Sequence, residues 1–425
     1  MQKNKGCKTV GVRLYGERDI RLEEFELPPY GDGEVLLRVV SDSLCASTYK
    51  AVKQGASHKR VPPDIAENPV IIGHELCGEI IGVGARYADR FQVGDRAVLQ
   101  PALKLESGYD PGYSYPTVGG STVYAVVPEI VLERGCLIPY HGDSFFKGSL
   151  VECLACDLRG LKGLYHTDYE TYSRSDDEKR GGKLAILGGA GPMGIGLVDL
   201  VVGRGRAAEV TVTDLDEERL AFARRSCSPE AALARGVKVN YVNTSGVTDV
   251  AAYLKELSGG GFDDVFVMVP VPELFTMAEE ISREDGCINF FAGPPVHEMA
   301  GALNLYRVHY DGIHVVGTAG SIPSDMEEVI SYIEEQRIEP ACLVSHILGL
   351  RAVPEAIYAM ETPCGAKKVC YNEIDIPLIA IADLPRLGES DPFYRALAEI
   401  VAKNGGLWCA EAERYLLANG PKIMQ

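Results

Sequence analysis

Four residues in the first 152 positions are candidates for a single metal site: Cys45 in SLCASTYK, His74 and Glu75 in VIIGHELCGE, and Glu152 in GSLVECLAC. A catalytic zinc ion needs three or four nitrogen, sulfur or oxygen ligands, with one position left for water or substrate. Taken singly, each residue has an ordinary explanation, because a lone cysteine is commonly a core residue and a lone glutamate is commonly solvated. The sequence therefore raises the question of whether the fold brings them together.

A glycine-rich segment offers a second kind of chemistry. GGAGPMG holds Gly189, Gly191 and Gly194 in the spacing G-x-G-x-x-G, between the apolar run KLAIL and the helical pattern MGIGLVDLVVG. Glycines allow the backbone to approach a pyrophosphate, and a helix N-terminus offers free N–H groups. A turn without a ligand is the alternative. We predict a dinucleotide site formed by the backbone of Gly189, Gly191, Pro192, Met193 and Gly194.

Asp214 bears on which dinucleotide binds. It ends the next apolar run, twenty residues after Gly194, where a carboxylate can accept hydrogen bonds from the adenosine ribose hydroxyls. The same charge repels a 2′-phosphate, which predicts NAD(H) rather than NADP(H). Arg219 lies five residues further on and could reach such a phosphate, so NADP(H) stays open as the alternative.

The elements that must position these residues predict an α/β protein. From residue 8 to about 150, short β-rich runs separated by Gly, Pro and Asp indicate a strand-rich domain. From residue 183 onward, apolar strands alternate with helical segments, as in a parallel sheet covered by helices on both faces. We divide the chain into residues 1–160, 181–325 and 326–425, the last returning to the first domain and adding a C-terminal extension whose role the sequence does not predict.

Composition limits the possible partners. The 425 residues carry a formal net charge of -18 and no clustered basic face, which argues against nucleic acid or an anionic membrane. No apolar stretch has the character of a signal peptide or a membrane span. Twelve cysteines without paired spacing predict reduced thiols and a cytoplasmic protein.

The order of several short motifs resembles that of the medium-chain zinc-dependent alcohol and polyol dehydrogenases. These motifs are C-x-S at 45–47, GHE-x-x-G at 73–78, G-x-G at 82–84, VGDR at 93–96, GG at 119–120, GSLVE at 148–152 and GGAGPMG. The chain is most similar to the sorbitol dehydrogenase branch, and its length and tail resemble the L-sorbose 1-phosphate reductase group. The resemblance implies a Rossmann-type doubly wound sheet plus a strand-rich GroES-like catalytic domain.

The resemblance also implies a metal site. Cys45, His74 and Glu152 would bind one catalytic zinc per chain, with Glu75 as a further ligand or an exchangeable neighbour. No cysteine lies between VGDRAVLQ and STVYAVVP, so the four-cysteine zinc lobe of many relatives is absent. Ser47 would hydrogen-bond the substrate hydroxyl. Lys50 stands where many relatives carry a relay histidine, which leaves the proton route open.

The expected activity is reversible hydride transfer between NAD(P)(H) and a ketose or polyol in a homodimer or homotetramer. A sugar phosphate such as L-sorbose 1-phosphate is the expected substrate, because one basic stretch could bind a phosphate: Lys50, Lys53, His58, Lys59 and Arg60. The same stretch could also be a solvated loop. The alternatives are an unphosphorylated polyol or threonine-like alcohol as substrate, or a nucleotide-binding relative without turnover.

Overall fold

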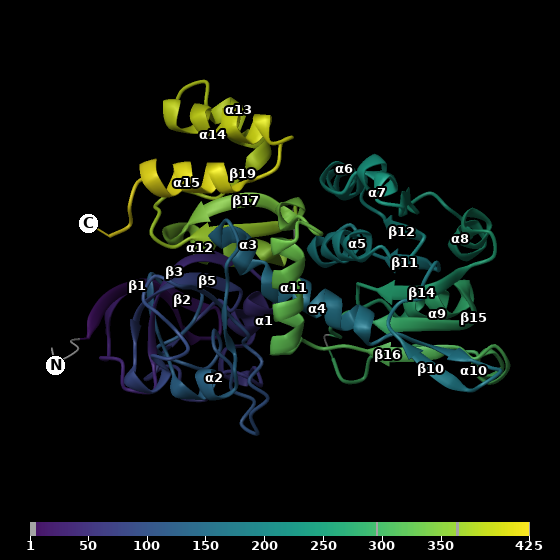
Figure 1. The fold of residues 1–425 in the computed structure, drawn as a ribbon, viewed down its shortest axis with the longest axis horizontal. Helices are drawn as coiled ribbons and strands as arrows, with labels where there is room; N and C mark the ends of the chain where they lie inside the picture. Colours follow the sequence, from purple (N-terminus) through teal and green to yellow (C-terminus); the bar gives the residue numbers. More distant parts are fainter. Residues whose placement is uncertain (1–5, 295, 363–364, 425) are drawn as a thin grey trace. The chain divides into compact units, whose positions relative to one another are not determined.

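The chain forms two units, which are coloured along the sequence in Figure 1. The structure is a computed structural model and describes residues 6–294, 296–362 and 365–424. Unit 1 consists of Met1–Glu152, Ile322–Glu334 and Val344–Gln425. Unit 2 consists of Cys153–Ser321 and Glu335–Leu343. The α/β class predicted from the sequence is confirmed.

Unit 1 is rich in strands. Its larger sheet has the order β19-β17-β18-β3-β5-β6-β8, with β7 also paired to β3, and its smaller sheet has the order β2-β1-β4. The strands are β1 Cys7–Gly16, β2 Asp19–Leu27, β3 Val35–Ser43, β4 Val70–Ile71, β5 Leu76–Val83, β6 Arg96–Leu99, β7 Tyr124–Val127, β8 Leu137–Pro139, β17 Val344–Gly349, β18 Lys367–Tyr371 and β19 Ile379–Ala380. β3 is central because it pairs with β18, β5 and β7.

The helices of unit 1 are mostly short. They are α1 Ala46–Gln54, α2 Glu129–Glu133, α3 Phe145–Ser149, α11 Pro323–Glu334, α12 Val353–Tyr358, α13 Leu384–Leu387, α14 Pro392–Lys403 and α15 Ala410–Asn419, while α4 Val151–Lys162 begins in unit 1 and continues in unit 2. No described helix in either unit has the length and apolar character needed to cross a membrane.

The C-terminal extension is part of the core of unit 1. Helices α13 to α15 lie together beside β17 and β19 (yellow in Figure 1). Trp408 is fully buried, and its indole N–H donates to the Tyr371 hydroxyl at 2.6 Å. The buried Glu413 carboxylate accepts the backbone N–H groups of Phe145 and Phe146, at 2.7 and 2.8 Å, at the start of α3. Burial raises the pKa of Glu413 to about 7.

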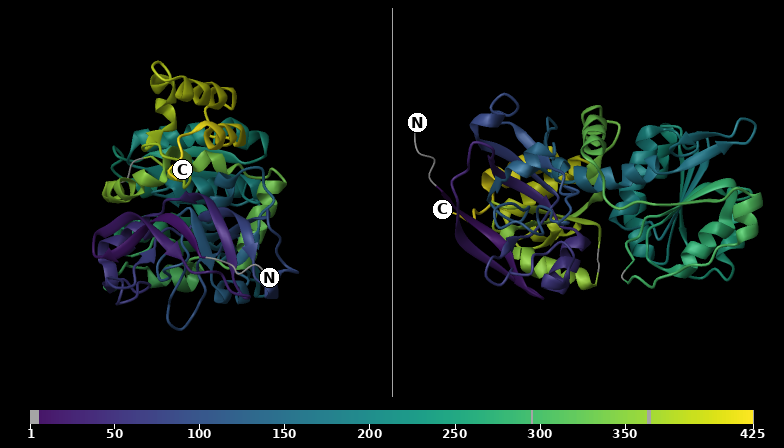
Figure 2. Two further views of the ribbon diagram at one scale, coloured as in Figure 1. Left: turned by 90° about the vertical axis from the view of Figure 1, so that its left-hand side faces the viewer. Right: turned by 90° about the horizontal axis from the view of Figure 1, so that it is seen from below.

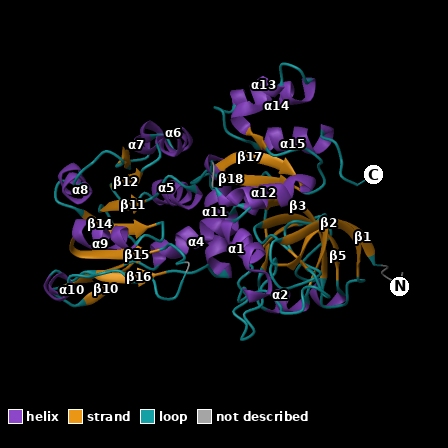
Figure 3. Cartoon of the chain, turned by 180° about the vertical axis from the view of Figure 1, so that it is seen from behind, coloured by secondary structure: helices purple, strands orange, loops and turns teal. Residues whose placement is uncertain are grey.

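Unit 2 is a doubly wound sheet. Its six parallel strands have the order β13-β12-β11-β14-β15-β16, the arrangement typical of a dinucleotide-binding fold. Helices flank the sheet (Figures 2 and 3). The strands are β11 Lys183–Leu187, β12 Glu209–Asp214, β13 Lys238–Asn243, β14 Phe262–Val267, β15 Ser282–Phe290 and β16 His314–Gly317. The helices are α5 Pro192–Arg204, α6 Glu217–Ser226, α7 Pro229–Ala234, α8 Val250–Ser258, α9 Pro272–Ile281 and α10 Leu305–Tyr310.

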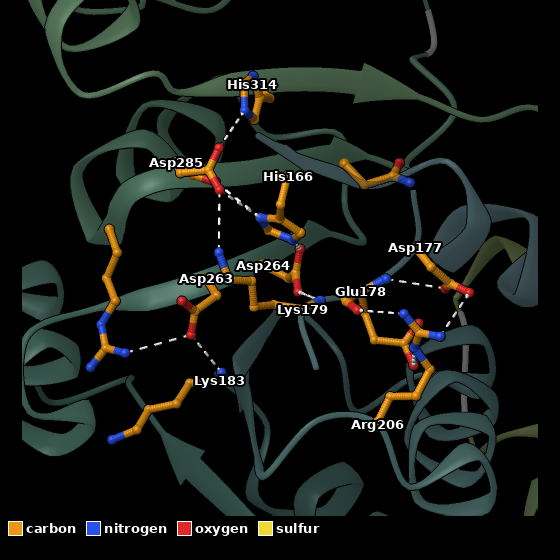
Figure 4. A network of polar contacts seen from close by, with 12 residues as sticks. His166, Asp177, Glu178, Lys179, Lys183, Arg206, Asp263, Asp264, Asp285 and His314 are labelled. Carbon is orange, nitrogen blue, oxygen red and sulfur yellow. Dashed lines mark hydrogen bonds and ion pairs between the residues drawn. The ribbon is translucent and has the colours of Figure 1, made fainter. Parts of the chain in front are cut away.

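A polar network fastens a hairpin to this sheet (Figure 4). The hairpin, β9 Tyr165–Asp168 and β10 Ser173–Asp176, comes from the charged segment that precedes β11. His166 Nε2 lies 3.1 Å from Asp264 Oδ1 on β14. Asp285 on β15 accepts hydrogen bonds from the Thr167 backbone and from His314, both at 2.9 Å. These contacts tie the hairpin to β14 and β15, and His314 on β16 shares the Asp285 carboxylate.

Candidate metal and dinucleotide sites

Cys45, His74 and Glu75 come together where β3 ends and β5 begins. Cys45 is the N-cap of α1, two residues after the last residue of β3, and His74 and Glu75 directly precede β5. The Ser43 backbone N–H donates to the Glu75 carbonyl at 2.9 Å, which holds the two segments side by side. The sulfur, imidazole and carboxylate atoms all lie within 4.8 Å of one another. Residues 30 positions apart thus form one cluster because β3 and β5 are neighbours.

Two glycines explain the shape of this cluster. Gly73 has φ +89°, and a Cβ there would lie 2.2 Å from Asp42 Oδ2, so only glycine fits before His74. A Cβ on Gly112 would lie 2.1 Å from the Gly73 carbonyl oxygen. The two backbone segments therefore approach closely, which lays the Tyr113 ring against the His74 ring at 4.9 Å between centroids.

Three hydroxyl groups surround the His74 ring. The Thr48 hydroxyl lies 3.1 Å from Nδ1, and the Ser47 hydroxyl lies 3.2 Å from Nε2. The Tyr113 hydroxyl donates to Ser47 Oγ at 2.9 Å, and Ser47 donates to Cys45 Sγ at 3.1 Å. With Thr48 accepting from Nδ1, the Nε2 atom is free to act as a metal ligand. Burial lowers the pKa of His74 to about 4, so the ring is neutral, as a ligand must be.

Glu75 is paired with a lysine. Both carboxylate oxygens accept hydrogen bonds from Lys367 Nζ, at 2.6 and 2.5 Å, and both side chains are buried. Burial alone would raise the pKa of Glu75, but the charge of Lys367 and its hydrogen bonds hold that pKa below 4.5. Glu75 is therefore a carboxylate, and it can act as a ligand only by giving up part of its contact with Lys367.

The donor set suits a zinc ion. Burial, followed by the charge of Glu75, raises the pKa of Cys45 to about 12, so the free thiol keeps its proton and a metal would displace it. Glu152, in the first turn of α4, is buried, and its charge also contributes to the raised pKa of Cys45. A thiol, an imidazole and a carboxylate within ligand distance of one centre match the known preferences of zinc.

The basic stretch converges on His58. Burial lowers the pKa of His58 to about 4, and the charges of Arg60, Lys59 and Lys50 lower it further. The His58 ring stacks on Tyr113 at 5.9 Å. The Arg60 guanidinium lies 4.9 Å from the Tyr113 ring centre, and its Nε atom pairs with Asp110 at 3.0 Å. Lys50 is exposed. Lys53 acts on a different group, because its charge, together with that of Arg18, lowers the pKa of Glu361.

The glycine-rich turn lies between β11 and α5 in unit 2. Gly191 is the N-cap of α5 and Pro192 its first residue, followed by Met193. A Cβ on Gly194 would lie 2.0 Å from the Gly189 carbonyl oxygen, whereas a Cβ on Gly191 would meet no protein atom within 4 Å. The Gly194 position is required by the turn itself, and Gly191 leaves the backbone open to a ligand.

Asp214 lies at the end of β12, beside this turn. Its carboxylate accepts the Ala190 N–H at 3.2 Å and the Leu215 and Asp216 N–H groups at 2.9 and 3.2 Å. The aspartate therefore shapes the turn in addition to any contact with a ribose. The Arg219 guanidinium lies 3.6 Å from Asp216 Oδ2, where its charge is partly offset.

Sequence reasoning missed three residues of the metal cluster. Tyr113 and Thr48 lie against His74. Lys367, on β18, contacts Glu75 from 292 positions further along the chain. Thr48 falls three residues after Cys45 on α1, which was a usable signal, because such residues share a helix face. Tyr113 gave no comparable signal. A lysine opening an apolar strand, as in KKVCY, was a weak hint of a buried anion nearby.

Comparisons with known proteins agree with this architecture. Residues 31–135 match the alcohol dehydrogenase GroES-like domain, and residues 192–335 match the zinc-binding dehydrogenase domain. The chain is 42% identical to mannitol-1-phosphate 5-dehydrogenase of Aliivibrio fischeri, with 96% of this chain and 97% of that protein covered. It is 41% identical to L-sorbose 1-phosphate reductase of Klebsiella pneumoniae, with 98% of each covered. The crystal structure of 2R,3R-butanediol dehydrogenase from Bacillus subtilis superposes with a TM-score of 0.70 at 22% identity, covering 86% of this chain and 99% of that chain.

Proposed function

Because this chain belongs to the zinc-binding dehydrogenase family, we propose that it transfers a hydride between NAD(H) and the carbonyl carbon of a ketose phosphate. The observation that supports this most directly is the convergence of Cys45, His74 and Glu75 beneath the hydroxyl groups of Ser47 and Tyr113. That arrangement combines metal ligands with a proton donor at one point, which is what reduction of a carbonyl requires.

Cys45, His74 and Glu152 would hold the zinc ion, with Glu75 as the neighbour that can exchange into the ligand set. When bound, the zinc supplies Lewis-acid polarisation of a substrate oxygen, and the nicotinamide supplies or accepts the hydride. Thr48 fixes the orientation of the His74 ring through Nδ1. Through its ion pair, Lys367 keeps the buried Glu75 carboxylate ionised.

Ser47 is positioned to move the proton. Its hydroxyl accepts from Tyr113 and donates to Cys45 Sγ, so a substrate oxygen would take the place of sulfur as the acceptor. Tyr113 then resupplies the proton to Ser47, and the half-exposed His58 ring stacks on the Tyr113 ring beside this route. Lys50 is exposed and acts on His58 through its charge, so its proposed role is to bias this route electrostatically.

The turn at Gly189, Gly191, Pro192, Met193 and Gly194 would bind the pyrophosphate of the cofactor. Asp214 would accept hydrogen bonds from the ribose and disfavour a 2′-phosphate. Arg219 is the residue that could support NADP(H), but its proximity to Asp216 weakens that role.

A substrate phosphate is favoured by the charges that converge on His58. Lys50, Lys59 and Arg60 all act on this ring, which itself stacks on Tyr113. Two relatives that cover nearly the whole chain are named for hexose or hexitol 1-phosphates. Because the net charge of the chain is -18, long-range attraction contributes little to binding an anion, and selection must come from such short-range contacts.

Steady-state kinetics on paired substrates test this proposal. We expect L-sorbose 1-phosphate to be reduced with a kcat/KM at least about tenfold above that of L-sorbose, because a charge-assisted hydrogen bond contributes roughly 1.5 to 3 kcal/mol. Lys59→Ala should narrow the gap, whereas the control Lys53→Ala, whose charge acts near Glu361, should leave it unchanged. Equal kcat/KM values for the two sugars would contradict the phosphate proposal and favour a dehydrogenase of an unphosphorylated polyol.

A further inference from the structure

A second group of metal-binding side chains lies within unit 2. Asp199 comes from α5, Cys227 follows the last residue of α6, and Cys342 lies in the short 3-10 helix η3 Pro340–Leu343. One carboxylate oxygen and the two sulfur atoms all lie within 4.8 Å of one another. Three separate segments of the chain therefore direct a potential ligand to a single point.

The surface of α5 explains how the third segment reaches this point. Gly196, Asp199 and Gly203 recur at helical spacing, so they share one face of α5. A Cβ on Gly203 would lie 2.5 Å from Ile338, and one on Gly196 would lie 3.4 Å from Leu343. The segment Glu335–Leu343 thus packs directly on the helix backbone. Asp199 is the polar side chain on this face and accepts the Glu339 N–H at 2.8 Å.

The two thiols occupy fixed positions. Cys227 is the C-cap of α6, its N–H donates to Ala223, and its carbonyl accepts the Tyr241 hydroxyl at 2.8 Å. Cys342 is buried, and burial raises its pKa well above 9.0, with further contributions from a hydrogen bond to Cys227 and from the charges of Asp199 and Glu339. Several acidic groups therefore share a small, largely buried space.

We propose that Asp199, Cys227 and Cys342 bind a zinc ion that is distinct from the one at Cys45 and His74. Tetrahedral zinc with bonds of about 2.3 Å to sulfur and 2.1 Å to oxygen places its ligands roughly 3.5 to 3.8 Å apart, within the observed limit of 4.8 Å. Two thiolates and one carboxylate select a borderline-soft cation over calcium or magnesium. Binding releases the two thiol protons to solvent, and a water molecule would complete the fourth position.

The ion would act as a structural staple. It would join α5, α6 and the segment Glu335–Leu343, which returns to unit 2 after α11. The sequence predicted one zinc per chain because the four-cysteine lobe is absent, and this second site raises the expected content to two. The inference does not depend on the proposed activity, since none of its ligands belongs to the Cys45 cluster.

Metal analysis of the purified full-length chain tests the site. We expect two zinc ions per wild-type chain, one in the double variant Cys227→Ser/Cys342→Ser, and one in Cys45→Ser. The double variant Cys7→Ser/Cys409→Ser removes the same number of thiols from half-buried positions elsewhere and should keep two. One zinc in the wild type, or two in Cys227→Ser/Cys342→Ser, would overturn the proposal.

A second measurement needs no variant and remains informative if the double variant does not fold. In native wild-type protein, zinc should protect Cys227 from alkylation by iodoacetamide, and removal of zinc by a chelator should expose it, as identified by peptide mass spectrometry. Labelling of Cys227 that is insensitive to chelation counts against the site. Recovery of Cys227 and Cys342 as one disulfide-linked peptide from unreduced, freshly purified protein would also refute it.

Discussion

Replacing Lys367 with methionine should reveal how strongly unit 1 depends on the ion pair beneath the metal cluster. The side chains of Lys367 and Glu75 are 3% and 1% exposed, and Nζ contacts both carboxylate oxygens, at 2.6 and 2.5 Å. Methionine keeps most of the volume of the lysine side chain but leaves Glu75 as a buried charge without this partner. Removing one member of a buried pair costs roughly 3 to 5 kcal/mol. We therefore expect the metal-free variant to lose about 3 kcal/mol of unfolding free energy.

The double variant Glu75→Gln/Lys367→Met isolates the cause. Removing both charges at once avoids the unpaired carboxylate, so most of the lost stability should return. Trp408 is the single tryptophan of the chain and is buried in unit 1, so urea titration followed by its fluorescence reports on this unit alone. Lys403→Met, at the exposed end of α14, controls for the substitution itself. A loss below about 1 kcal/mol in Lys367→Met, or a double variant no more stable than the single one, would refute the reasoning.

Three further outcomes follow from the sites. Cys45→Ser and His74→Ala should abolish turnover but leave NADH binding, measured by fluorescence titration, nearly unchanged. The reason is that the proposed metal ligands and the glycine-rich turn belong to different units. Wild-type turnover in either variant would contradict the assignment of the metal site. NADH should be preferred over NADPH by at least about tenfold in kcat/KM, or about 1.4 kcal/mol, and Asp214→Asn should reduce this preference. Equal kcat/KM values for NADH and NADPH in the wild type would contradict the proposed role of Asp214. Glu413 has a folded pKa of about 7, above the ordinary 4.5, so the folded chain holds this proton more tightly than the unfolded chain does. The contribution of Glu413 to the unfolding free energy should therefore fall by about 3 kcal/mol as the pH rises from about 4.5 to 7. Glu413→Gln should flatten that decline in urea titrations at the two pH values, and an unchanged slope would argue against it.

Motifs that depend on local geometry were predictable from the sequence. The turn at Gly189 to Gly194 requires glycine where a Cβ would strike the backbone, and Asp214 follows at the distance set by one βαβ unit. The order of short motifs indicated the zinc-dependent dehydrogenase family, and the comparisons confirm that resemblance.

Contacts made across the chain were not predictable in this way. Lys367 reaches Glu75 only because β18 pairs with β3, and nothing near residue 75 in the sequence announces it. Tyr113 is placed by the close approach of Gly112 to Gly73, a tertiary contact between two loops. The sequence predicted no role for the C-terminal extension, because Glu413 acts on a distant helix: it accepts a backbone N–H group at the start of α3, 268 residues earlier.

The way the chain is threaded also sets an order of assembly during synthesis. The six strands of unit 2 are complete once residue 317 has been made, and consecutive strands pair with each other except that β14 pairs with β11. Unit 1 begins earlier but must wait for β18, Trp408 and Glu413 from the end of the chain. Once Glu335–Leu343 has also been made, a nascent chain therefore carries every segment of unit 2 while the sheet holding Cys45 and His74 still lacks β18. A ribosome-stalled chain ending at residue 380 should protect unit 2 from protease while unit 1 is still cleaved.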